Sequence, residues 1–258
     1  MPELQNIYTV VSNEKLCPAF HRLCFDAPAI RDHVRAGQFV HIRTNAHGYE
    51  PFFRRPFSVY RAQKHIEVFY EVVGPGTGIM SQWKKGDRID VLGPVGTPFT
   101  HPPEGVKQVV MVAGGIGVAP FLILTDELKK RGLQLVLLYG GRSGEHVYEM
   151  KEFKANGCEI HVATNDGTAG VKGFVSEHFD KIDLNPQTTM VYTCGPHVMM
   201  HAVQQFTKKH KLRAQAACEE IMACALGACL GCSIRTTKGF RTVCYDGPVF
   251  DLQEIIFD

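Results

Sequence analysis

The sequence predicts a β barrel over residues 1–101, then an α/β domain with a parallel sheet over residues 102–213, and last a small cysteine-bearing domain over residues 214–258. Three observations predict this order. Short runs rich in Val, Ile, Phe and Tyr fill the first part. Buried apolar runs alternate with amphipathic stretches in the second. The last part is rich in Cys, Gly and Ala and is too small to fold without additional stabilisation.

The barrel prediction rests on strands that we expect at residues 38–44, 57–62 and 65–73. Each run clusters or alternates apolar residues and is bounded by Gly, Pro or polar residues, which is typical of strands joined by turns. One short helix is expected over residues 78–83.

The α/β prediction rests on apolar strands expected at residues 109–113, 133–139, 159–163 and 190–193. Amphipathic stretches follow the first and the last of them, and the first of these stretches ends in basic residues before Gly132, which are helix-stop signals. Buried strands that alternate with helices indicate a parallel sheet.

Composition and charge exclude several classes of function. The chain of 258 residues carries 28 Lys+Arg against 26 Asp+Glu, and this balance offers no broad basic surface for nucleic acid or an anionic membrane. No apolar run reaches the roughly 20 residues of a membrane span. The amino terminus has neither the basic nor the apolar region of a signal peptide. We therefore expect a cytoplasmic protein, whose nine cysteines need a use other than disulfides.

Four of these cysteines predict an iron–sulfur cluster. Cys224, Cys229 and Cys232 have the spacing C-x4-C-x2-C, and Cys244 follows. This is the spacing of plant-type [2Fe–2S] ligation, in which four thiolates hold two irons. The small residues between them leave room for backbone amides to approach the sulfurs.

Other uses of the same cysteines fit less well. A structural zinc site usually has two pairs of cysteines that are each close in the sequence. Cys232 and Cys244 are too far apart in the sequence to form the second pair. Attached haem needs His after Cys232, where Ser233 stands. A redox pair of Cys229 and Cys232 would not need the other two. Cys218 could be a further ligand, although the four-cysteine pattern does not require it.

A glycine-rich loop predicts a nucleotide site in the α/β domain. The strand at 109–113 runs into Gly114, Gly115 and Gly117, and a helix start follows, so that bare N–H groups and a helix dipole favour a phosphate. Pro120 stands where the usual dinucleotide fingerprint has its third glycine, and a tight turn without a ligand is the alternative.

Two further loops lie at the carboxyl ends of expected strands, where parallel sheets bind ligands. Cys194, Gly195 and Pro196 end the strand at 190–193 and face the expected crevice. Arg142, after the strand at 133–139, either meets a ribose or phosphate or is a solvated loop arginine.

The barrel contains a second candidate phosphate site. Arg55, with Arg54 before it, suits a pyrophosphate, and the hydroxyl of Ser58 can reach a flavin ring nitrogen. Thr77, at the start of the short helix, can hold the same pyrophosphate. A surface arginine and a plain helix cap are the alternative.

The order of three motifs resembles the ferredoxin–NADP⁺ reductase superfamily: Arg55-Pro56-Phe57-Ser58, then Gly114 to Pro120, then Cys194-Gly195-Pro196. With its tail, the chain more narrowly resembles the electron-transfer subunits of the B-type, NAD-dependent dihydroorotate dehydrogenases. Their tail motif reads M-A-C-G-x-G-A-C-x-x-C, then V-C-x-D-G-P-V-F. Here it runs from Met222 to Cys232 and from Val243 to Phe250.

The resemblance implies an oxidoreductase subunit that acts in pyrimidine (UMP) biosynthesis. FAD in the barrel would exchange a hydride with NAD(H) and pass single electrons through [2Fe–2S] to an FMN-containing catalytic subunit that oxidises dihydroorotate. We expect a heterotetramer built from pairs of the two subunits. The pyrimidine would bind to the partner, because this chain has no room for a TIM barrel of about 250 residues.

The resemblance also implies which residues bind each group, and no catalytic side chain is expected because the chemistry is centred on the flavin. FAD would be bound by Arg55, Pro56, Phe57, Ser58 near flavin N5, Tyr70, Glu71, Val72, Gly76 and Thr77. NAD(H) would be bound by Gly114, Gly115, Gly117, Pro120, Cys194, Gly195 and Pro196. Iron would be bound by Cys224, Cys229, Cys232 and Cys244.

Two positions depart from the family pattern. Ala225 stands where the family usually has Gly, which adds a Cβ beside the cluster. Phe57 stands where many reductases of the superfamily have Tyr, so no phenol faces the flavin there.

Two other functions share many of these motifs. One is a flavin/iron–sulfur NAD(P)H reductase subunit of a hydrogenase or a sulfide dehydrogenase. The other is no enzyme but a zinc-stabilised nucleotide-binding module, which would be colourless where flavin and iron–sulfur are brown.

Overall fold

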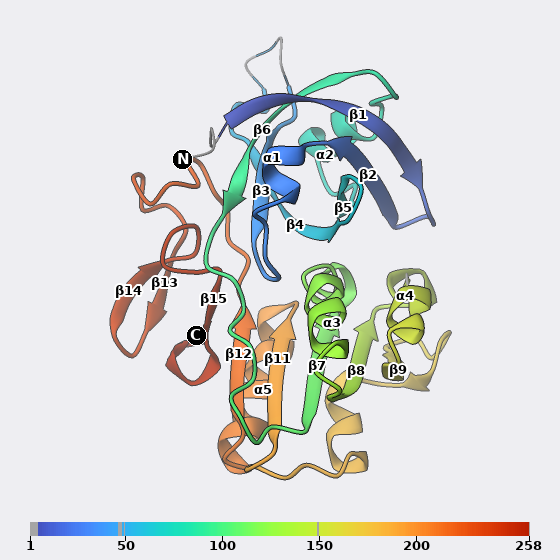
Figure 1. The fold of residues 1–258 in the computed structure, drawn as a ribbon, viewed down its shortest axis with the longest axis vertical. Helices are drawn as coiled ribbons and strands as arrows, with labels where there is room; N and C mark the ends of the chain where they lie inside the picture. Colours follow the sequence, from blue (N-terminus) through green and yellow to red (C-terminus); the bar gives the residue numbers. More distant parts are fainter. Residues whose placement is uncertain (1–4, 46–47, 49, 149, 258) are drawn as a thin grey trace.

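A computed structural model describes residues 5–45, 48, 50–148 and 150–257. The first four residues of the segment in which no signal peptide is expected therefore lie outside the described residues. The first part of the chain forms a closed barrel with the strand order β1-β2-β5-β4-β3-β6 (Figure 1). Its strands are β1 (Gln5–Lys15), β2 (Phe20–Asp26), β3 (Phe39–Arg43), β4 (Arg55–Ala62), β5 (Ile66–Glu71) and β6 (Arg88–Val95).

The barrel closes around apolar side chains that alternate along its strands. Val40 and Ile42 of β3 belong to the interior cluster, together with Val59 of β4 and Val68 of β5. Phe39, on the opposite face of β3, packs instead with the carboxyl-terminal tail. Two short helices accompany the barrel: α1 (Pro28–Arg31) and α2 (Pro75–Met80).

The second part forms a seven-stranded sheet with the order β10-β9-β8-β7-β11-β12-β15. Its strands are β7 (Gln108–Gly114), β8 (Gln134–Gly141), β9 (Glu159–Thr164), β10 (Val171–Lys172), β11 (Thr189–Cys194), β12 (Arg213–Ala217) and β15 (Val249–Asp251). All neighbours are parallel except β15, which runs antiparallel to β12.

Helices cover both faces of this sheet, and its central strand β7 is therefore buried on both sides. Val109 and Met111 of β7 pack in one cluster with Phe121 of α3. Val110 of β7 packs in another with Met200 of α5. The helical segments are α3 (Phe121–Lys129), α4 (Met150–Ala155), α5 (His197–Lys209) and the 3₁₀ turns Gly115–Val118, Gly144–His146 and Val175–Lys181.

The tail wraps from the sheet to the barrel (Figure 1). It contains the hairpin of β13 (Ser233–Thr236) and β14 (Gly239–Thr242), then β15, and it ends in a 3₁₀ turn, Leu252–Glu254. Thr97 of the barrel donates a backbone hydrogen bond to the carbonyl of Gly247 over 2.6 Å. The tail therefore joins the sheet and the barrel instead of standing apart.

Most predicted elements are present, and the differences lie at their ends. The strands expected at 38–44, 57–62 and 65–73 are β3, β4 and β5. The short helix begins and ends earlier than expected, as α2, because Pro75 starts it. After the glycine loop the chain first makes a 3₁₀ turn, and α3 begins only at Phe121. Among the described residues, no helix is long and apolar enough to span a membrane.

Candidate functional site

A cavity of about 750 Å³ lies where the barrel, the parallel sheet and the tail meet. Its barrel wall consists of Gly37, Phe39, Phe53, Arg55, Pro56, Phe57, Ser58, Phe69, Tyr70, Glu71, Val73 and Thr77. Its sheet wall consists of Ile116, Ala119, Cys194, His197 and Ala217. Its tail wall consists of Cys218, Glu219, Glu220, Ile221, Met222 and Pro248. One hollow thus joins the predicted flavin motif, the ends of two sheet strands and the approach to the cysteine loop.

Eight predicted binding residues line this cavity, and eight do not. Those that line it are Arg55, Pro56, Phe57, Ser58, Tyr70, Glu71, Thr77 and Cys194. Those that do not are Val72, Gly76, Gly114, Gly115, Gly117, Pro120, Gly195 and Pro196. Most of the second set are glycines or prolines that shape the adjoining backbone.

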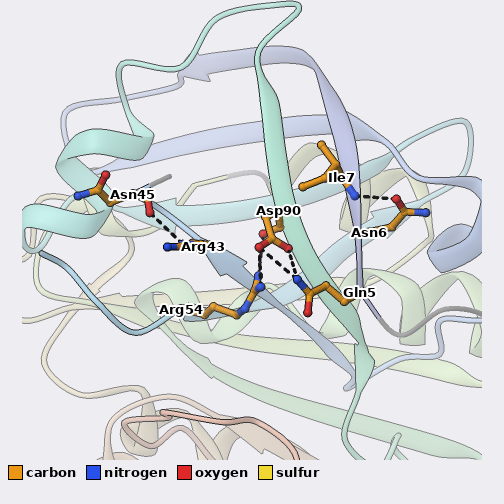
Figure 2. A network of polar contacts seen from close by, with 7 residues as sticks. All are labelled: Gln5, Asn6, Ile7, Arg43, Asn45, Arg54 and Asp90. Atoms are coloured by element: carbon orange, nitrogen blue, oxygen red, sulfur yellow. Dashed lines mark hydrogen bonds and ion pairs between the residues drawn. The ribbon is translucent and has the colours of Figure 1, made fainter. Parts of the chain in front are cut away.

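The two adjacent arginines of the barrel point to different partners. Arg54 Nη2 lies 2.6 Å from Asp90 Oδ2, and Arg54 Nη1 donates to the Asp90 carbonyl over 3.0 Å (Figure 2). Gln5 Nε2 donates to the other carboxylate oxygen of Asp90 over 3.1 Å. Arg54 therefore ties β6 to the start of β4, and Arg55 alone faces the cavity.

The surroundings of Arg55 fit a phosphate group. A Cβ on Gly76 would lie 3.1 Å from Thr44 Oγ1 and 3.5 Å from Arg55 Nε, so only a glycine keeps this space open. Thr44 is 2% exposed, and its hydroxyl has no hydrogen-bond partner among the described residues. A buried hydroxyl without a partner beside a guanidinium is suited to an anionic oxygen. Thr44 was not apparent from the sequence, because it lies outside every motif.

Thr77 has a structural task as well as a place on the cavity wall. Its hydroxyl accepts hydrogen bonds from the backbone N–H groups of Val73 and Gly74 over 3.0 and 3.3 Å. These bonds shape the turn that precedes α2. The Thr77 hydroxyl therefore shapes the backbone of this turn, and the residue also lies on the cavity wall.

The aromatic floor of the cavity is rigid. Tyr70 donates its hydroxyl to Asn13 Oδ1 over 2.9 Å, and its ring meets Phe57 edge-on with centroids 6.1 Å apart. Burial raises the pKa of Tyr70 to about 12, against a smaller opposite effect of the Asn13 bond. Tyr70 therefore stays a neutral phenol at physiological pH.

The glycine loop and the Cys-Gly-Pro turn touch each other. They follow the neighbouring strands β7 and β11, in which Ala113 lies opposite Cys194. A Cβ on Gly117 would overlap the carbonyl of Cys194, and one on Gly114 would lie 2.6 Å from Pro196 Cδ. These glycines therefore permit close packing of the two loops. Ile116, Ala119 and Cys194 are the residues that this packing presents to the cavity.

Two buried thiols line the cavity, one on its sheet wall and one on its tail wall. Burial raises the pKa of Cys194 well above its usual range, and the charge of Glu219 adds to this effect. Burial likewise raises the pKa of Cys218 to about 12, and the charges of Glu220 and Glu219 add to it. Both remain protonated and act as small apolar groups, not as nucleophiles.

Arg142 forms a contact between the sheet and the barrel. Its Nη2 lies 3.2 Å from Glu71 Oε1, on the cavity wall. The arginine side chain is 71% exposed, so this ion pair contributes little to stability and leaves the guanidinium accessible.

The four predicted cluster cysteines gather in two pairs along the tail loop. The backbone N–H of Cys229 donates to Cys224 Sγ, and the backbone N–H of Cys244 donates to Cys232 Sγ, each over 3.4 Å. Among the described residues, no three His, Cys, Asp or Glu side chains converge on a point that one metal ion could occupy. Two pairs suit a cluster of two irons with two thiolates each better than one tetrahedral zinc.

Backbone N–H groups surround these sulfurs. Cys224 Sγ accepts from the N–H groups of Leu226 and Cys229, each over 3.4 Å, and Cys244 Sγ accepts from Gly227 over 3.2 Å. Burial would raise the pKa of Cys224, but hydrogen bonds from its neighbours outweigh burial and lower this pKa to about 7. Burial and the Cys232 thiol raise the pKa of Cys244 to about 12. The loop thus donates hydrogen bonds to sulfurs as a thiolate-bound cluster requires.

The loop bends through left-handed backbone conformations. Ala225 has φ 58° and Leu230 has φ 57°, and each is costly for a residue with a Cβ by about 1 kcal/mol. Gly227 has φ 77°, and a Cβ there would lie 2.9 Å from Tyr245 Cβ. The alanine that departs from the family pattern therefore stands where the backbone favours glycine.

The tail wall of the cavity was not predicted. Residues 218–222 precede the first cluster cysteine and include Glu219, whose pKa is raised by burial. His197 Nε2 lies 3.9 Å from Glu220 Oε1 across this wall. Met222 begins the tail motif and Cys218 is a candidate for a further ligand, but no motif or periodicity marks residues 219–221, and only their position between the sheet and the cysteines could have suggested them.

Two protein families match parts of the chain. The iron–sulfur cluster binding domain of dihydroorotate dehydrogenase B matches residues 219–256, and the oxidoreductase NAD-binding domain matches residues 111–205.

Curated relatives match almost the whole chain. A protein of Desulforamulus reducens named dihydroorotate dehydrogenase B (NAD(+)), electron transfer subunit, is 34% identical over 250 residues, which cover 94% of this chain and 95% of that one. The protein of the same name from Streptococcus pneumoniae is 36% identical and covers 93% and 94%.

Solved structures agree on the fold. An NADH-dependent reduced ferredoxin–NADP oxidoreductase, described in relation to flavin-based electron bifurcation, superposes with a TM-score of 0.86 at 27% identity, over 98% of this chain and 91% of that one. A ferredoxin NADP⁺ reductase from Neisseria gonorrhoeae with bound FAD and NADP superposes with a TM-score of 0.69 at 20% identity, over 80% and 92%. The barrel followed by a parallel sheet is thus the reductase fold.

Proposed function

Because the chain belongs to the family of dihydroorotate dehydrogenase B electron transfer subunits, we propose that it carries electrons between NAD(H) and an FMN-containing catalytic subunit that oxidises dihydroorotate in pyrimidine biosynthesis. The cofactors are FAD, a [2Fe–2S] cluster and diffusible NAD(H). We place the complex in the cytoplasm as a heterotetramer built from pairs of both subunits.

One observation carries this proposal: a single cavity is walled by the flavin motif, by the ends of sheet strands and by the residues that lead into the cysteine loop. A nucleotide reductase without an electron outlet needs only the first two walls. The third wall includes Met222, which lies two residues before Cys224, and so connects the cavity with the cluster loop.

The division of labour follows the three parts of the chain. We assign FAD binding to residues 1–101, NAD(H) binding to residues 102–213 and cluster binding to residues 214–258. The boundary between the NAD(H)-binding part and the cluster-binding part is not a clean separation, since β15 of the tail returns to pair with β12 of the sheet. The tail thereby holds the cluster loop against the other two parts.

The barrel residues bind and orient the flavin. Arg55 and the free hydroxyl of Thr44 offer donors to the pyrophosphate beside the open space at Gly76. Ser58 lies on the cavity wall, on the strand that begins with Arg55, and we assign it to the flavin N5 side. When bound, FAD accepts a hydride as an electron pair and releases single electrons to the cluster, as this relay requires.

The sheet residues bind the nicotinamide nucleotide. The glycine loop from Gly114 to Pro120 offers backbone N–H groups after β7. Cys194 sits on the cavity wall as an uncharged group and excludes water from that side. Gly195 and Pro196 hold this turn against the glycine loop.

The tail residues bind the cluster. We assign Cys224 with Cys229 to one iron and Cys232 with Cys244 to the other, following the two pairs that are joined by N–H to sulfur hydrogen bonds. Backbone N–H groups of residues 226, 227 and 229 stabilise the sulfurs. The match to an iron–sulfur domain supports this over a zinc-stabilised module.

The experiment uses the complex isolated anaerobically with its native partner. Dihydroorotate and NAD⁺ are added, and NADH formation is recorded. The wild-type complex should form NADH, Cys229→Ser should not, and Cys17→Ser should serve as a matched control with normal rates. A brown, NADH-reducible complex that forms no NADH from dihydroorotate would contradict the proposal.

A second candidate has a specific observation in its favour. The superposition with a TM-score of 0.86 is on an NADH-dependent reduced ferredoxin–NADP oxidoreductase. The chain could therefore serve as the flavin/iron–sulfur subunit of a complex that exchanges electrons with ferredoxin. Reduction of NAD(P)⁺ by reduced ferredoxin, without dihydroorotate oxidation, would favour this candidate.

A further inference from the structure

Arg142 and Glu71 form an ion pair between the NAD(H)-binding part and the flavin-binding part. Arg142 directly follows the carboxyl end of β8, and Glu71 is the last residue of β5. Arg142 Nη2 donates to Glu71 Oε1 over 3.2 Å, and Glu71 lies on the cavity wall. Among the described residues, Glu71 is the only side chain bonded to this guanidinium. The pair therefore joins two parts of the chain to which we assign different cofactors.

The place of Arg142 in the sheet brings its guanidinium near the nucleotide. β7 and β8 are parallel neighbours in which Gly114 lies opposite Gly140, so Arg142 comes two residues after the position beside the glycine loop. In dinucleotide-binding sheets, roughly 20 residues after the glycines, an acidic residue binds the ribose 2′-hydroxyl of NAD or an arginine binds the 2′-phosphate of NADP. Arg142 occupies the comparable place, after the next strand, although the proposed function uses NAD(H).

The loop after β8 is held against the barrel at further points. His146 packs edge-on against Phe20 with ring centroids 6.0 Å apart, and Phe20 lies opposite Glu71 in the pairing of β2 with β5. Arg61 Nη2 of β4 lies 3.1 Å from Glu152 Oε1 of α4. These contacts keep the loop, and the arginine at its start, beside Glu71.

The stability of the fold does not account for this ion pair. The Arg142 side chain is 71% exposed and the Glu71 side chain is 26% exposed, and exposed ion pairs contribute little to stability. Carboxylates and phosphates are both preferred partners of a guanidinium, because their oxygens match its N–H groups. Glu71 therefore competes with a 2′-phosphate for Arg142.

We propose that Glu71, by pairing with Arg142, makes the nucleotide site select NAD(H) over NADP(H). Glu71 belongs to the flavin-binding part, so the choice of nicotinamide nucleotide is made across the contact between the two parts. The inference rests on the proposed function only through its nucleotide site. A complex that binds NADH without oxidising dihydroorotate would contradict the proposed function and not this inference.

The test measures how the flavin-loaded protein binds two probes, adenosine 5′-monophosphate and adenosine 2′,5′-bisphosphate, which differ only in the 2′-phosphate. Isothermal titration calorimetry gives both dissociation constants. The variants are Glu71→Gln, Arg142→Gln and the double variant, and the flavin content of each is measured first. Glu152→Gln is the matched control, because it removes a second ion pair between the same two parts.

We expect the wild type to bind the bisphosphate no more tightly than the monophosphate, and Arg142→Gln to leave this ratio unchanged. Glu71→Gln should tighten binding of the bisphosphate by about tenfold, the factor for one charge-assisted hydrogen bond, and leave binding of the monophosphate unchanged. The double variant should lose this gain, because no guanidinium remains to meet the phosphate. In stopped-flow flavin reduction, the preference of Glu71→Gln for NADH over NADPH should fall by a similar factor.

Unchanged binding of the bisphosphate in Glu71→Gln would overturn the proposal. An equal gain in Glu152→Gln would overturn it too, as would a gain in Glu71→Gln that persists in the double variant, because the effect would not act through Arg142. A wild type that already binds the bisphosphate several times more tightly than the monophosphate would show that Glu71 does not withhold Arg142 from a phosphate.

Discussion

Gly117 lies directly against the carbonyl of Cys194, so that the loop after β7 and the turn after β11 form one continuous backbone surface. A Cβ at residue 117 would also approach Gly195 Cα to 2.9 Å. The two motifs are far apart in the sequence and meet because β7 and β11 are neighbours in the sheet. A small residue in one loop thus sets the position of the other.

Gly117→Ala should separate these loops and weaken NAD(H) binding. The added methyl group meets backbone atoms that cannot rotate away, and overpacking of this kind costs about 1–3 kcal/mol. We expect the KM for NADH to rise at least about tenfold, with normal flavin and iron contents. Gly144→Ala, whose added Cβ would make an ordinary 3.4 Å contact, is the control. An unchanged KM in Gly117→Ala would contradict the assigned loop packing.

Arg55→Ala should weaken flavin binding, whereas Arg54→Ala should mainly weaken the barrel. Loss of a charge-assisted contact to the pyrophosphate costs about 1.5–3 kcal/mol, or roughly tenfold to a hundredfold in FAD affinity. Arg54 holds Asp90 instead, and its loss should lower the Tm. The ratio of flavin to protein after gel filtration and the Tm of each variant check this. Equal flavin loss in both variants at the same Tm would count against the separate roles.

Ala225→Gly should stabilise the cluster loop. Residue 225 has φ 58°, which glycine adopts freely, and the gain should be about 1 kcal/mol. The half-life of the cluster's visible absorption in air should lengthen, and Ala228→Gly, three residues on and without a positive φ, should not lengthen it. A shorter half-life in Ala225→Gly would show that the methyl group protects the cluster.

The stability of the folded protein should depend on pH through His41. Its folded pKa is about 4 against an ordinary 6.5, because burial disfavours the charged ring. Between these values the unfolded chain binds more protons, so this contribution is full above pH 6.5 and is lost as the pH falls toward 4.

Wild type should therefore lose about 2 kcal/mol more than His41→Leu on going from about pH 7.5 to about pH 5. Urea unfolding of both proteins at the two pH values measures the difference. A parallel loss in both proteins would mean that His41 titrates normally in the folded state.

Local sequence patterns predicted those candidate site residues that belong to short motifs. They missed the residues that gain a role only when distant segments of the chain come together. The cysteine spacing, the glycine loop and Arg55 are each visible within a few residues. His41 lies inside β3 and Thr44 directly follows it, and only the approach of the tail and of Gly76 gives these two positions their surroundings.

The tail shows the same limit at the level of the fold. Its cysteines predicted a separate small domain. In the structure, however, β15 of the tail pairs with β12 of the sheet, and residues 217–222 form part of the cavity wall. Such contacts join segments that no local periodicity connects.

The central claim is that one chain passes electrons from NADH through a flavin to a cluster held by Cys224, Cys229, Cys232 and Cys244. An anaerobic reductive titration, followed by absorption and electron paramagnetic resonance, tests it most directly. Wild type should take up one more electron per chain than Cys229→Ser, which should keep its flavin and lose the cluster signal. Equal electron uptake, with the same resonance signal in both proteins, would contradict the account.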